Sequence, residues 1–355
     1  MRLVFTFVTL FALIAKAEAG PFTICTRFQV VKLNQRINGC VIDMTHNHSK
    51  DFRFWSESLC EKRSMYVYLP PGYDATEKYP VMIWLHGFIQ DERDFLNLVP
   101  YFDQAIACGQ LPPMIIAAPD GSIRGRPNLF NAGSFYVNSR AGRFEDFIAC
   151  DVWNLLASTF PIRPEREAHA LAGASMGGFG AYNLAIKYKD RFKVVGGFMP
   201  PLNMRYVDCH NRYQPNFDPN CFGSEESYRP RKVIGIFRGV ILVQEKHFLD
   251  PLYGRNRTEV AKAIVRENPV DMIAAYDVKP GDYSFFIGYG GRDELNIDAQ
   301  VESFLFLTKD RNLNPTVAYQ PNGRHSTEAG IKMIPEFNAW LDPLIRPYAP
   351  ATPMK

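Results

Sequence analysis

Short apolar runs recur along most of the chain and alternate with amphipathic stretches. Most of the runs end in Gly, Pro, Asp or Asn, which is typical of strands followed by turns. The stretches between them space their apolar residues for one face of a helix. Strands that alternate with helices indicate βαβ units, so we expect an α/β fold with a mostly parallel central sheet flanked by helices. The runs predict strands over residues 65–69, 81–85, 114–118, 168–172, 194–198, 284–287 and 316–319, and the stretches predict helices over 146–158, 178–188 and 298–309.

The alternation stops between residues 207 and 268, where aromatic residues, prolines and charges are interleaved. This segment follows the strand predicted at 194–198 and is long for a loop in a compact domain. Such long loops are usually functional or disordered. We therefore expect an insertion that is either a lid or part of a substrate cleft, or else a surface excursion closed by a disulfide.

The N-terminal region is typical of a secretory signal peptide. Arg2 precedes an apolar run over residues 3–15, which is shorter than the ~20 residues that span a bilayer. Ala17-Glu18-Ala19 fits a small-x-small cleavage site, which predicts cleavage near Ala19–Gly20 and a secreted protein. The alternative is an N-terminal membrane anchor. No later run is long and apolar enough for a transmembrane helix, so we expect no stable membrane insertion.

These patterns divide the chain into segments. We expect a signal peptide over residues 1–19 and a polar, cysteine-bearing N-terminal extension over 20–63. The catalytic domain is expected over 64–345, with the insertion at 207–268 inside it, and a C-terminal tail over 346–355.

Composition and charge exclude a nucleic-acid partner. The 355 residues are 46% hydrophobic and 22% charged, and the formal net charge is +3. Basic residues are dispersed, and the densest patch, Arg229-Pro230-Arg231-Lys232, is too short for a nucleic-acid footprint. We expect this patch to be a solvated loop. Oligomeric state has no signal in the sequence.

All seven cysteines follow the predicted cleavage site, where an oxidising compartment would permit disulfides. We favour a bridge between Cys209 and Cys221, because both lie in one polar, turn-rich stretch. Cys108 and Cys150 lie at the ends of apparent helices and could be buried thiols. No cysteine or histidine cluster has metal-ligand spacing, so we expect no metal and no cofactor.

The clearest chemical signal is Gly173-Ala174-Ser175-Met176-Gly177, a G-x-S-x-G pentapeptide. In this motif the serine lies on a sharp strand-to-helix turn, where side chains two residues before and after would collide. Glycines Gly173 and Gly177 remove that collision. The pentapeptide alone is a weak signal, but a predicted strand precedes it and a predicted helix follows it. This context makes Ser175 the candidate nucleophile.

A serine nucleophile needs a base that accepts its proton and an acid that orients the base. In this type of fold the chain order is Ser, acid, His. His325 follows the last predicted strand, whereas the other histidines after Ser175 lie in the insertion, so His325 is the candidate base. Asp293 follows the strand at 284–287 and is the candidate acid. Asp298 is its main competitor, and Glu294 is expected to point elsewhere.

The developing oxyanion needs two backbone N–H donors. We expect one from Met176, the residue after the nucleophile. The other is expected from Phe88 in the loop His86-Gly87-Phe88, with Gly87 allowing close backbone approach. His86 is expected to brace this loop. The segment Gly288-x-Gly290 is a near miss to a dinucleotide fingerprint, and it lacks the third glycine, which argues against a nucleotide site.

Several segments resemble the α/β-hydrolase family of esterases that includes esterase D, the antigen 85 mycolyltransferases and the feruloyl esterases. The resemblance covers roughly residues 64–343 and implies triad roles for Ser175, Asp293 and His325. The N-terminal extension and the insertion depart from the family, and such segments set substrate choice in it. The matching segments are Trp84-Leu85-His86-Gly87, Phe144-Glu145-Asp146-Phe147-Ile148, Ala172-Gly173-Ala174-Ser175-Met176-Gly177-Gly178-Phe179-Gly180-Ala181, Gly291-Arg292-Asp293-Glu294 and Gly323-Arg324-His325.

We therefore expect a secreted serine carboxylic-ester hydrolase with a small-molecule or carbohydrate-linked substrate such as a feruloyl or acetyl ester. Aromatic residues of the insertion suggest stacking on a sugar and are equally consistent with packing. Alternatives are an acyltransferase of the antigen 85 type, a peptidase of the same fold, and a non-catalytic binding protein on the same scaffold. The aromatic residues concerned are Tyr206, Tyr213, Phe217, Phe222 and Tyr228.

Overall fold

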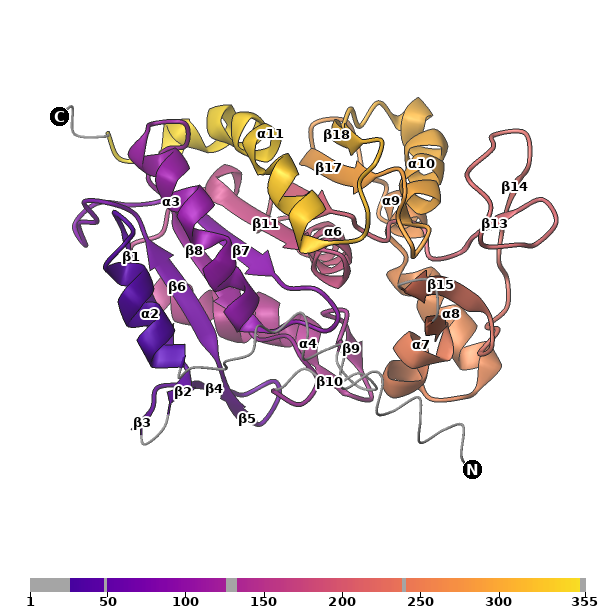
Figure 1. Cartoon of the computed structure of the whole chain (residues 1–355), viewed down its shortest axis with the longest axis horizontal. Coiled ribbons are helices and arrows are strands. Elements are labelled where there is room, and N and C mark those ends of the chain that lie inside the picture. Colours follow the sequence, from indigo (N-terminus) through magenta and orange to yellow (C-terminus); the bar gives the residue numbers. More distant parts are fainter. Residues whose placement is uncertain (1–25, 48–49, 126–132, 238–240, 352–355) are drawn as a thin grey trace.

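The strands predicted from the apolar runs lie side by side in one eight-stranded sheet (Figure 1). This computed structural model describes residues 26–47, 50–125, 133–237 and 241–351. The predicted signal peptide, its cleavage site and Cys25 lie outside these residues. From one edge to the other the strands are β1 (Cys40–Met44), β6 (Met65–Leu69), β8 (Ile115–Pro119), β7 (Val81–Leu85), β11 (His169–Ala174), β12 (Val194–Phe198), β17 (Ser284–Gly290) and β18 (Thr316–Gln320).

The sheet is mostly parallel, as predicted. Strand β6 runs antiparallel to both of its neighbours, and every pair from β8 to β18 is parallel. All residues of β7, β8 and β12 are buried, which explains why these strands are continuous apolar runs. Because parallel strands end at the same edge of a sheet, the loops after β7, β11, β12, β17 and β18 gather there.

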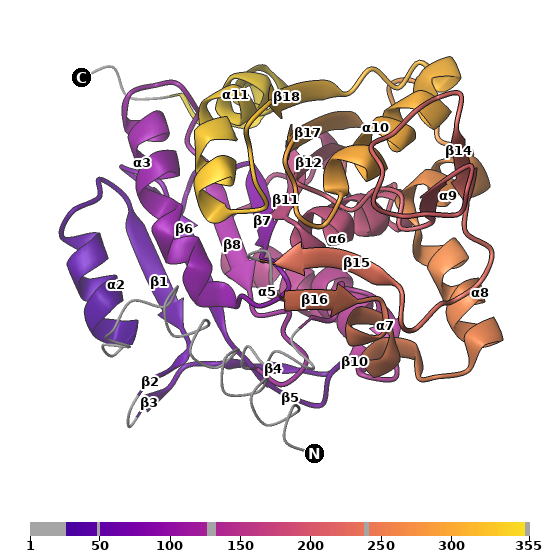
Figure 2. The same ribbon diagram turned by 45° about the vertical axis from the view of Figure 1, so that its right-hand side comes forward.

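Helices cover both faces of the sheet (Figure 2). They include α3 (Val99–Ala107), α6 (Met176–Lys187), α10 (Ile297–Thr308) and α11 (Thr327–Ile345). Two neighbouring glycines of β12 show the arrangement. A Cβ on Gly196 would lie 2.6 Å from the Phe337 ring of α11, and one on Gly197 would lie 3.2 Å from the Tyr182 ring of α6. Successive residues of a strand face opposite sides, so α11 and α6 pack on opposite faces.

Part of the predicted N-terminal extension joins this sheet. Helix α2 (Thr26–Asn34) leads into β1, which pairs antiparallel with β6 at the sheet edge. The Asp103 carboxylate of α3 fastens the connection, because it accepts hydrogen bonds from the backbone amides of Asn38 and Gly39 and from the Tyr68 hydroxyl. Short hairpins follow: β2 (His46–Asn47) with β3 (Lys50–Asp51), and β4 (Phe54–Ser56) with β5 (Glu61–Arg63).

The predicted helix at 146–158 is a composite of α4 (Phe144–Asp146), a π-helical turn at Phe147–Val152 and α5 (Trp153–Thr159). The hairpin of β9 (Asn138–Ser139) and β10 (Gly142–Arg143) precedes it. Of the helices that the structure describes, none is long and apolar enough to cross a membrane.

The insertion is folded, although its sequence shows no clear alternation. It contains the hairpins β13 (Tyr206–Asp208) with β14 (Phe222–Ser224) and β15 (Val233–Phe237) with β16 (Ile241–Gln244). Helices α7 (Lys246–Tyr253) and α8 (Arg257–Glu267) follow, and α9 (Pro269–Ala275) leads back to the sheet. Tyr206, Tyr213 and Tyr228 are buried, and Phe217 and Phe222 pack against Phe306 of α10. The three tyrosines are therefore core residues of the insertion, and the two phenylalanines are partly buried. This burial favours packing, the alternative to stacking on a sugar.

Two other expectations about the surface also change. Cys209 and Cys221 form the predicted disulfide, but Cys108 and Cys150 are exposed free thiols and not buried ones, because each lies on a helical turn that faces solvent. The basic patch is not wholly solvated either. The side chain of Lys232 is largely buried, and its ammonium pairs with the carboxylates of Glu225 and Glu245.

Candidate active site

Ser175 occupies a one-residue turn between β11, which ends at Ala174, and α6, which begins at Met176. Its φ of 53° and ψ of −117° lie in a region that non-glycine residues rarely adopt. The turn is held because the Ser175 amide donates a 2.7 Å hydrogen bond to the carbonyl of Phe198 at the end of β12. Strain of this kind is common at functional sites, where the surrounding structure maintains it.

The two glycines of the pentapeptide allow the turn to pack against the end of β7. A Cβ on Gly177 would lie 1.9 Å from the carbonyl oxygen of Leu85, and one on Gly173 would lie 2.5 Å from the same oxygen. Any side chain at either position would displace backbone. The structure therefore confirms the collision predicted from the motif. A side chain at Gly173 or Gly177 would collide with the end of β7 as well as with the turn itself.

His325 lies beside Ser175, in the loop between β18 and α11. Its Nε2 is 2.9 Å from the Ser175 hydroxyl oxygen, and its Nδ1 is 2.7 Å from a carboxylate oxygen of Asp293. Asp293 follows β17, and its side chain is fully buried. Burial alone would lower the pKa of His325, but the attraction to Asp293 outweighs it and raises the pKa. The arrangement can accept a proton from the serine and stabilise the resulting imidazolium.

The competing acids lie elsewhere. Glu294 accepts hydrogen bonds from the amide of His325 at 2.9 Å and from the Arg324 guanidinium at 2.5 Å. It therefore holds the backbone of the loop that carries His325, and not its ring. Asp298 lies in the first turn of α10, where burial raises its pKa to about 6. The geometry brings Asp293 to His325, as the sequence predicted.

The two expected oxyanion donors belong to segments that meet near Ser175: a Cβ on Gly87 would lie 3.6 Å from the carbonyl oxygen of Ala174. Met176 begins α6, and Phe88 follows Gly87 in the loop after β7. The Gly87 amide already donates to the Gln90 side chain at 2.8 Å, so the next amide of the loop is the available one. The Phe88 ring packs against Phe248 of the insertion, with ring centroids 4.4 Å apart.

His86 braces this loop, as expected. Its Nδ1 lies 2.8 Å from the carbonyl oxygen of Gly87, and its Nε2 accepts a hydrogen bond of 2.8 Å from the Gly121 amide. Both ring nitrogens are thereby occupied. A further residue, Tyr136, was not predicted: its buried hydroxyl donates to the His86 carbonyl at 3.1 Å. No local pattern marks Tyr136, because only tertiary packing brings it to His86.

In the part of the chain that the structure describes, one group of side chains is close enough together to share a metal ion. It consists of Cys209, His210 and Cys221. Its two sulfur atoms are bonded to each other in the disulfide, so they are not free as thiolate ligands.

Comparison with known sequences identifies relatives. The sequence profile of a family described as "Putative esterase" matches residues 56–345. An S-formylglutathione hydrolase from Bos taurus is 31% identical over 168 residues, which is 43% of this chain and 57% of that protein. The match thus spans little more than half the length of this relative.

Solved structures share the fold at lower sequence identity. A ferulic acid esterase aligns with a TM-score of 0.63 at 17% identity, over 87% of this chain and 99% of its own. An S-formylglutathione hydrolase from Agrobacterium tumefaciens aligns with a TM-score of 0.61 at 18% identity, over 87% and 96%. The fluorophosphonate-binding serine hydrolase F of Staphylococcus aureus aligns with a TM-score of 0.56 at 17% identity, over 85% and 98%.

Proposed function

The chain belongs to the "Putative esterase" family, and from this premise we propose that it hydrolyses carboxylic esters through an acyl-enzyme on Ser175. The observation that carries the proposal is the continuous chain of hydrogen bonds from the Ser175 hydroxyl through His325 to Asp293. This arrangement supports the proposed roles of Ser175 as nucleophile, His325 as base and Asp293 as orienting acid.

The reaction proceeds in two halves. His325 Nε2 takes the hydroxyl proton as the Ser175 oxygen attacks the ester carbonyl, and Asp293 stabilises the imidazolium. The backbone amides of Met176 and Phe88 stabilise the oxyanion. His325 then protonates the leaving alcohol. Water, activated by the same histidine, releases the acid from Ser175 in the second half.

For the substrate, we propose feruloyl or acetyl esters, including esters of carbohydrates. The shared fold with a ferulic acid esterase and the predicted export support this class. The buried aromatic residues of the insertion give it no support. A second candidate is an acylglutathione thioester, which is favoured by the 31% identity to an S-formylglutathione hydrolase.

An ester panel tests both candidates. The protein should turn over p-nitrophenyl acetate and one of methyl ferulate or S-formylglutathione, and Ser175→Ala should lower kcat by at least about 10⁴-fold. A fluorophosphonate probe should label the wild type and not the variant. If the wild type matches Ser175→Ala on every ester and stays unlabelled, the proposal is wrong. Added alcohol acceptors show whether acyl transfer competes with hydrolysis.

A further inference from the structure

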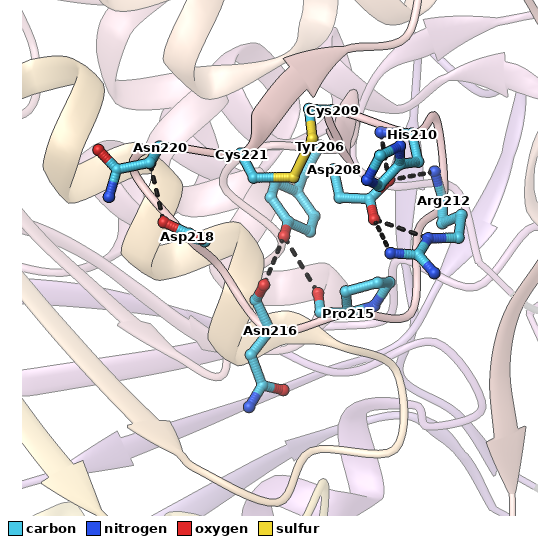
Figure 3. The surroundings of a disulfide bond; sticks show 10 residues. All are labelled: Tyr206, Asp208, Cys209, His210, Arg212, Pro215, Asn216, Asp218, Asn220 and Cys221. Atoms are coloured by element: carbon cyan, nitrogen blue, oxygen red, sulfur yellow. Dashed lines mark hydrogen bonds and ion pairs between the residues drawn. A yellow bond between two sulfur atoms is a disulfide. The ribbon is translucent and has the colours of Figure 1, made fainter.

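The segment that the disulfide closes, residues 209–221, contacts the loop that carries Asp293. We name this second loop, residues 291–296, the acid loop. We name residues 209–221 the disulfide loop. Figure 3 shows that side chains close to the disulfide tie this loop together. The buried Asp208 carboxylate accepts from the amides of His210 at 3.0 Å and Arg212 at 2.7 Å. The Tyr206 hydroxyl lies within hydrogen-bond distance of two carbonyl oxygens on the far side of the loop, those of Pro215 and Asn216.

Tyr213 lies between Arg212, which is bonded to Asp208, and Pro215, which is bonded to Tyr206. The Tyr213 hydroxyl reaches the acid loop, where it lies 2.5 Å from the carbonyl oxygen of Leu295. The Gln300 side-chain amide donates to the same hydroxyl at 2.7 Å, so the hydroxyl hydrogen must go to Leu295. The Asn296 side-chain amide in turn donates to the backbone carbonyl of Tyr213. Tyr213 is buried, so these bonds are shielded from water.

Leu295 connects Tyr213 directly to the acid. Its amide donates a 2.9 Å hydrogen bond to one carboxylate oxygen of Asp293, whose other oxygen bonds to His325. Asn296, with a left-handed φ of 56°, closes the turn by donating its amide to the Asp293 carbonyl. Tyr213 holds the carbonyl of Leu295, and Asp293 is bonded to the Leu295 amide. A shift of the Leu295 backbone would therefore move the Asp293 carboxylate relative to the His325 imidazole.

Strand β15 covers the same loop from another part of the insertion. A Cβ on Gly235 would lie 2.3 Å from the Leu295 side chain and 2.9 Å from the carbonyl oxygen of Glu294. Two hairpins of the insertion thus contact the acid loop, and the disulfide loop forms hydrogen bonds with Leu295 and Asn296.

We propose that the disulfide loop positions the catalytic acid, with Tyr213 as the positioning residue that acts on Asp293 through Leu295. This inference rests on the proposed esterase function. It gives the insertion a role in catalysis that is separate from substrate choice. Cross-linking Cys209 to Cys221 limits the conformations of the loop and thereby holds Tyr213 against the acid loop.

The test is Tyr213→Phe, which removes only the hydroxyl. We expect kcat for p-nitrophenyl acetate to fall roughly three- to tenfold with KM within about twofold. The acidic limb of the profile of kcat/KM against pH should move to lower pH, because a displaced Asp293 no longer offsets the burial of His325. A purely structural role would lower stability without moving this limb.

Tyr283→Phe is the matched control. The Tyr283 hydroxyl is also buried and also donates to a backbone carbonyl, that of Ala185, at 3.2 Å. It lies before the start of β17, whereas Asp293 lies after its end. This variant should lose stability like Tyr213→Phe but keep the wild-type pH limb.

Two further variants keep the inference testable if Tyr213→Phe does not fold. Tyr206→Phe loosens the disulfide loop and leaves Tyr213 intact, and Cys209→Ser with Cys221→Ser removes the cross-link. Both should shift the pH limb in the same direction by a smaller amount. If the wild type is active and all three variants keep its pH limb, the positioning role is overturned while the esterase function stands. If only the cysteine variant keeps it, the role of the cross-link is overturned. If the wild type turns over no ester, the proposed function itself fails.

Discussion

At the scale of single residues, the site contains a strained backbone conformation and a buried charged group, both of which are unfavourable unless neighbouring groups stabilise them. Ser175 has a positive φ, and Asp293 and His325 are buried together. Each is maintained by neighbours: the Phe198 carbonyl for Ser175, and the Leu295 amide for Asp293. Removing such a neighbour should therefore affect catalysis more than its own interaction energy suggests.

Gly177→Ala tests the packing of the turn against β7. The added methyl would lie 1.9 Å from the Leu85 carbonyl, so backbone must move, and we expect a loss of about 3 kcal/mol in the free energy of unfolding. Urea denaturation measures this loss. Gly330→Ala in α11 is the control, because its methyl would meet nothing closer than 3.5 Å. Equal stability of the two variants would contradict the steric argument.

Asp293→Asn tests the identity of the acid. Ester hydrolysis needs a neutral His325, so kcat/KM should rise as pH rises through the pKa of this histidine. Without the carboxylate, burial dominates and lowers that pKa, and the acidic limb should move to lower pH. We also expect kcat to fall by about 10³- to 10⁴-fold. In steady-state pH profiles Asp298→Asn should keep the wild-type limb. The reverse result would make Asp298 the acid.

At the scale of elements, the loop before β9 supports the loop His86-Gly87-Phe88. We name the latter the oxyanion loop, because we propose that its Phe88 amide binds the oxyanion. Phe135 and Tyr136 both have positive φ, at 52° and 56°. With this backbone, the Tyr136 hydroxyl donates a hydrogen bond to the His86 carbonyl. The Phe135 ring packs against the rings of Phe88 and Phe248. The oxyanion loop therefore lies between a strained loop of the hydrolase core and α7 of the insertion.

Tyr136→Phe should loosen that support. Losing one buried hydroxyl bond should lower the free energy of unfolding by about 1 kcal/mol and leave the His86 carbonyl without this donor. We expect kcat to fall several-fold with little change in KM, because the oxyanion amides act mainly in the transition state. Steady-state kinetics checks this. Tyr182→Phe, which removes a similar bond to the Phe286 carbonyl, should leave kcat nearly unchanged.

At the scale of the whole molecule, a buried cluster of charges fastens the insertion to the hydrolase core. The Lys187 ammonium of α6 lies 2.6 Å from the Glu145 carboxylate of α4 and 2.5 Å from the Glu267 carboxylate of α8. Burial alone would raise the pKa of Glu267, but the attraction to Lys187 outweighs it and lowers the pKa. The cluster joins three helices that are distant in sequence.

Glu267→Gln should therefore destabilise the protein in a pH-dependent way. At pH 7 we expect a loss of about 2 kcal/mol, since Lys187 keeps Glu145 as a partner. A lowered pKa means that the contribution is present above the ordinary pKa of glutamate and is lost as pH falls through the folded value. The difference between wild type and variant should shrink below pH ~4. Urea denaturation at pH 7 and at lower pH measures it. A difference independent of pH would argue against the ion pair.

Much of the site could be read from the sequence because its signals are local. Apolar runs marked the strands, and the pentapeptide marked the turn at Ser175 whatever surrounds it. The chain order Ser, acid, His, together with the position of each residue after a predicted strand, then made Asp293 and His325 the candidate partners. These inferences needed only local patterns and their order along the chain.

Tertiary structure alone decided the rest, because it depends on which distant segments pack together. It placed Asp293, and not its competitor Asp298, at the His325 ring. It also showed that Tyr206, Tyr213 and Tyr228 of the insertion are buried, which favours packing over stacking on a sugar. It also brought Tyr213 to Leu295, which lies 82 residues further along the chain. The signals for the proposed chemistry at Ser175 thus lie in local sequence, whereas the proposed support of its acid depends on how the insertion packs.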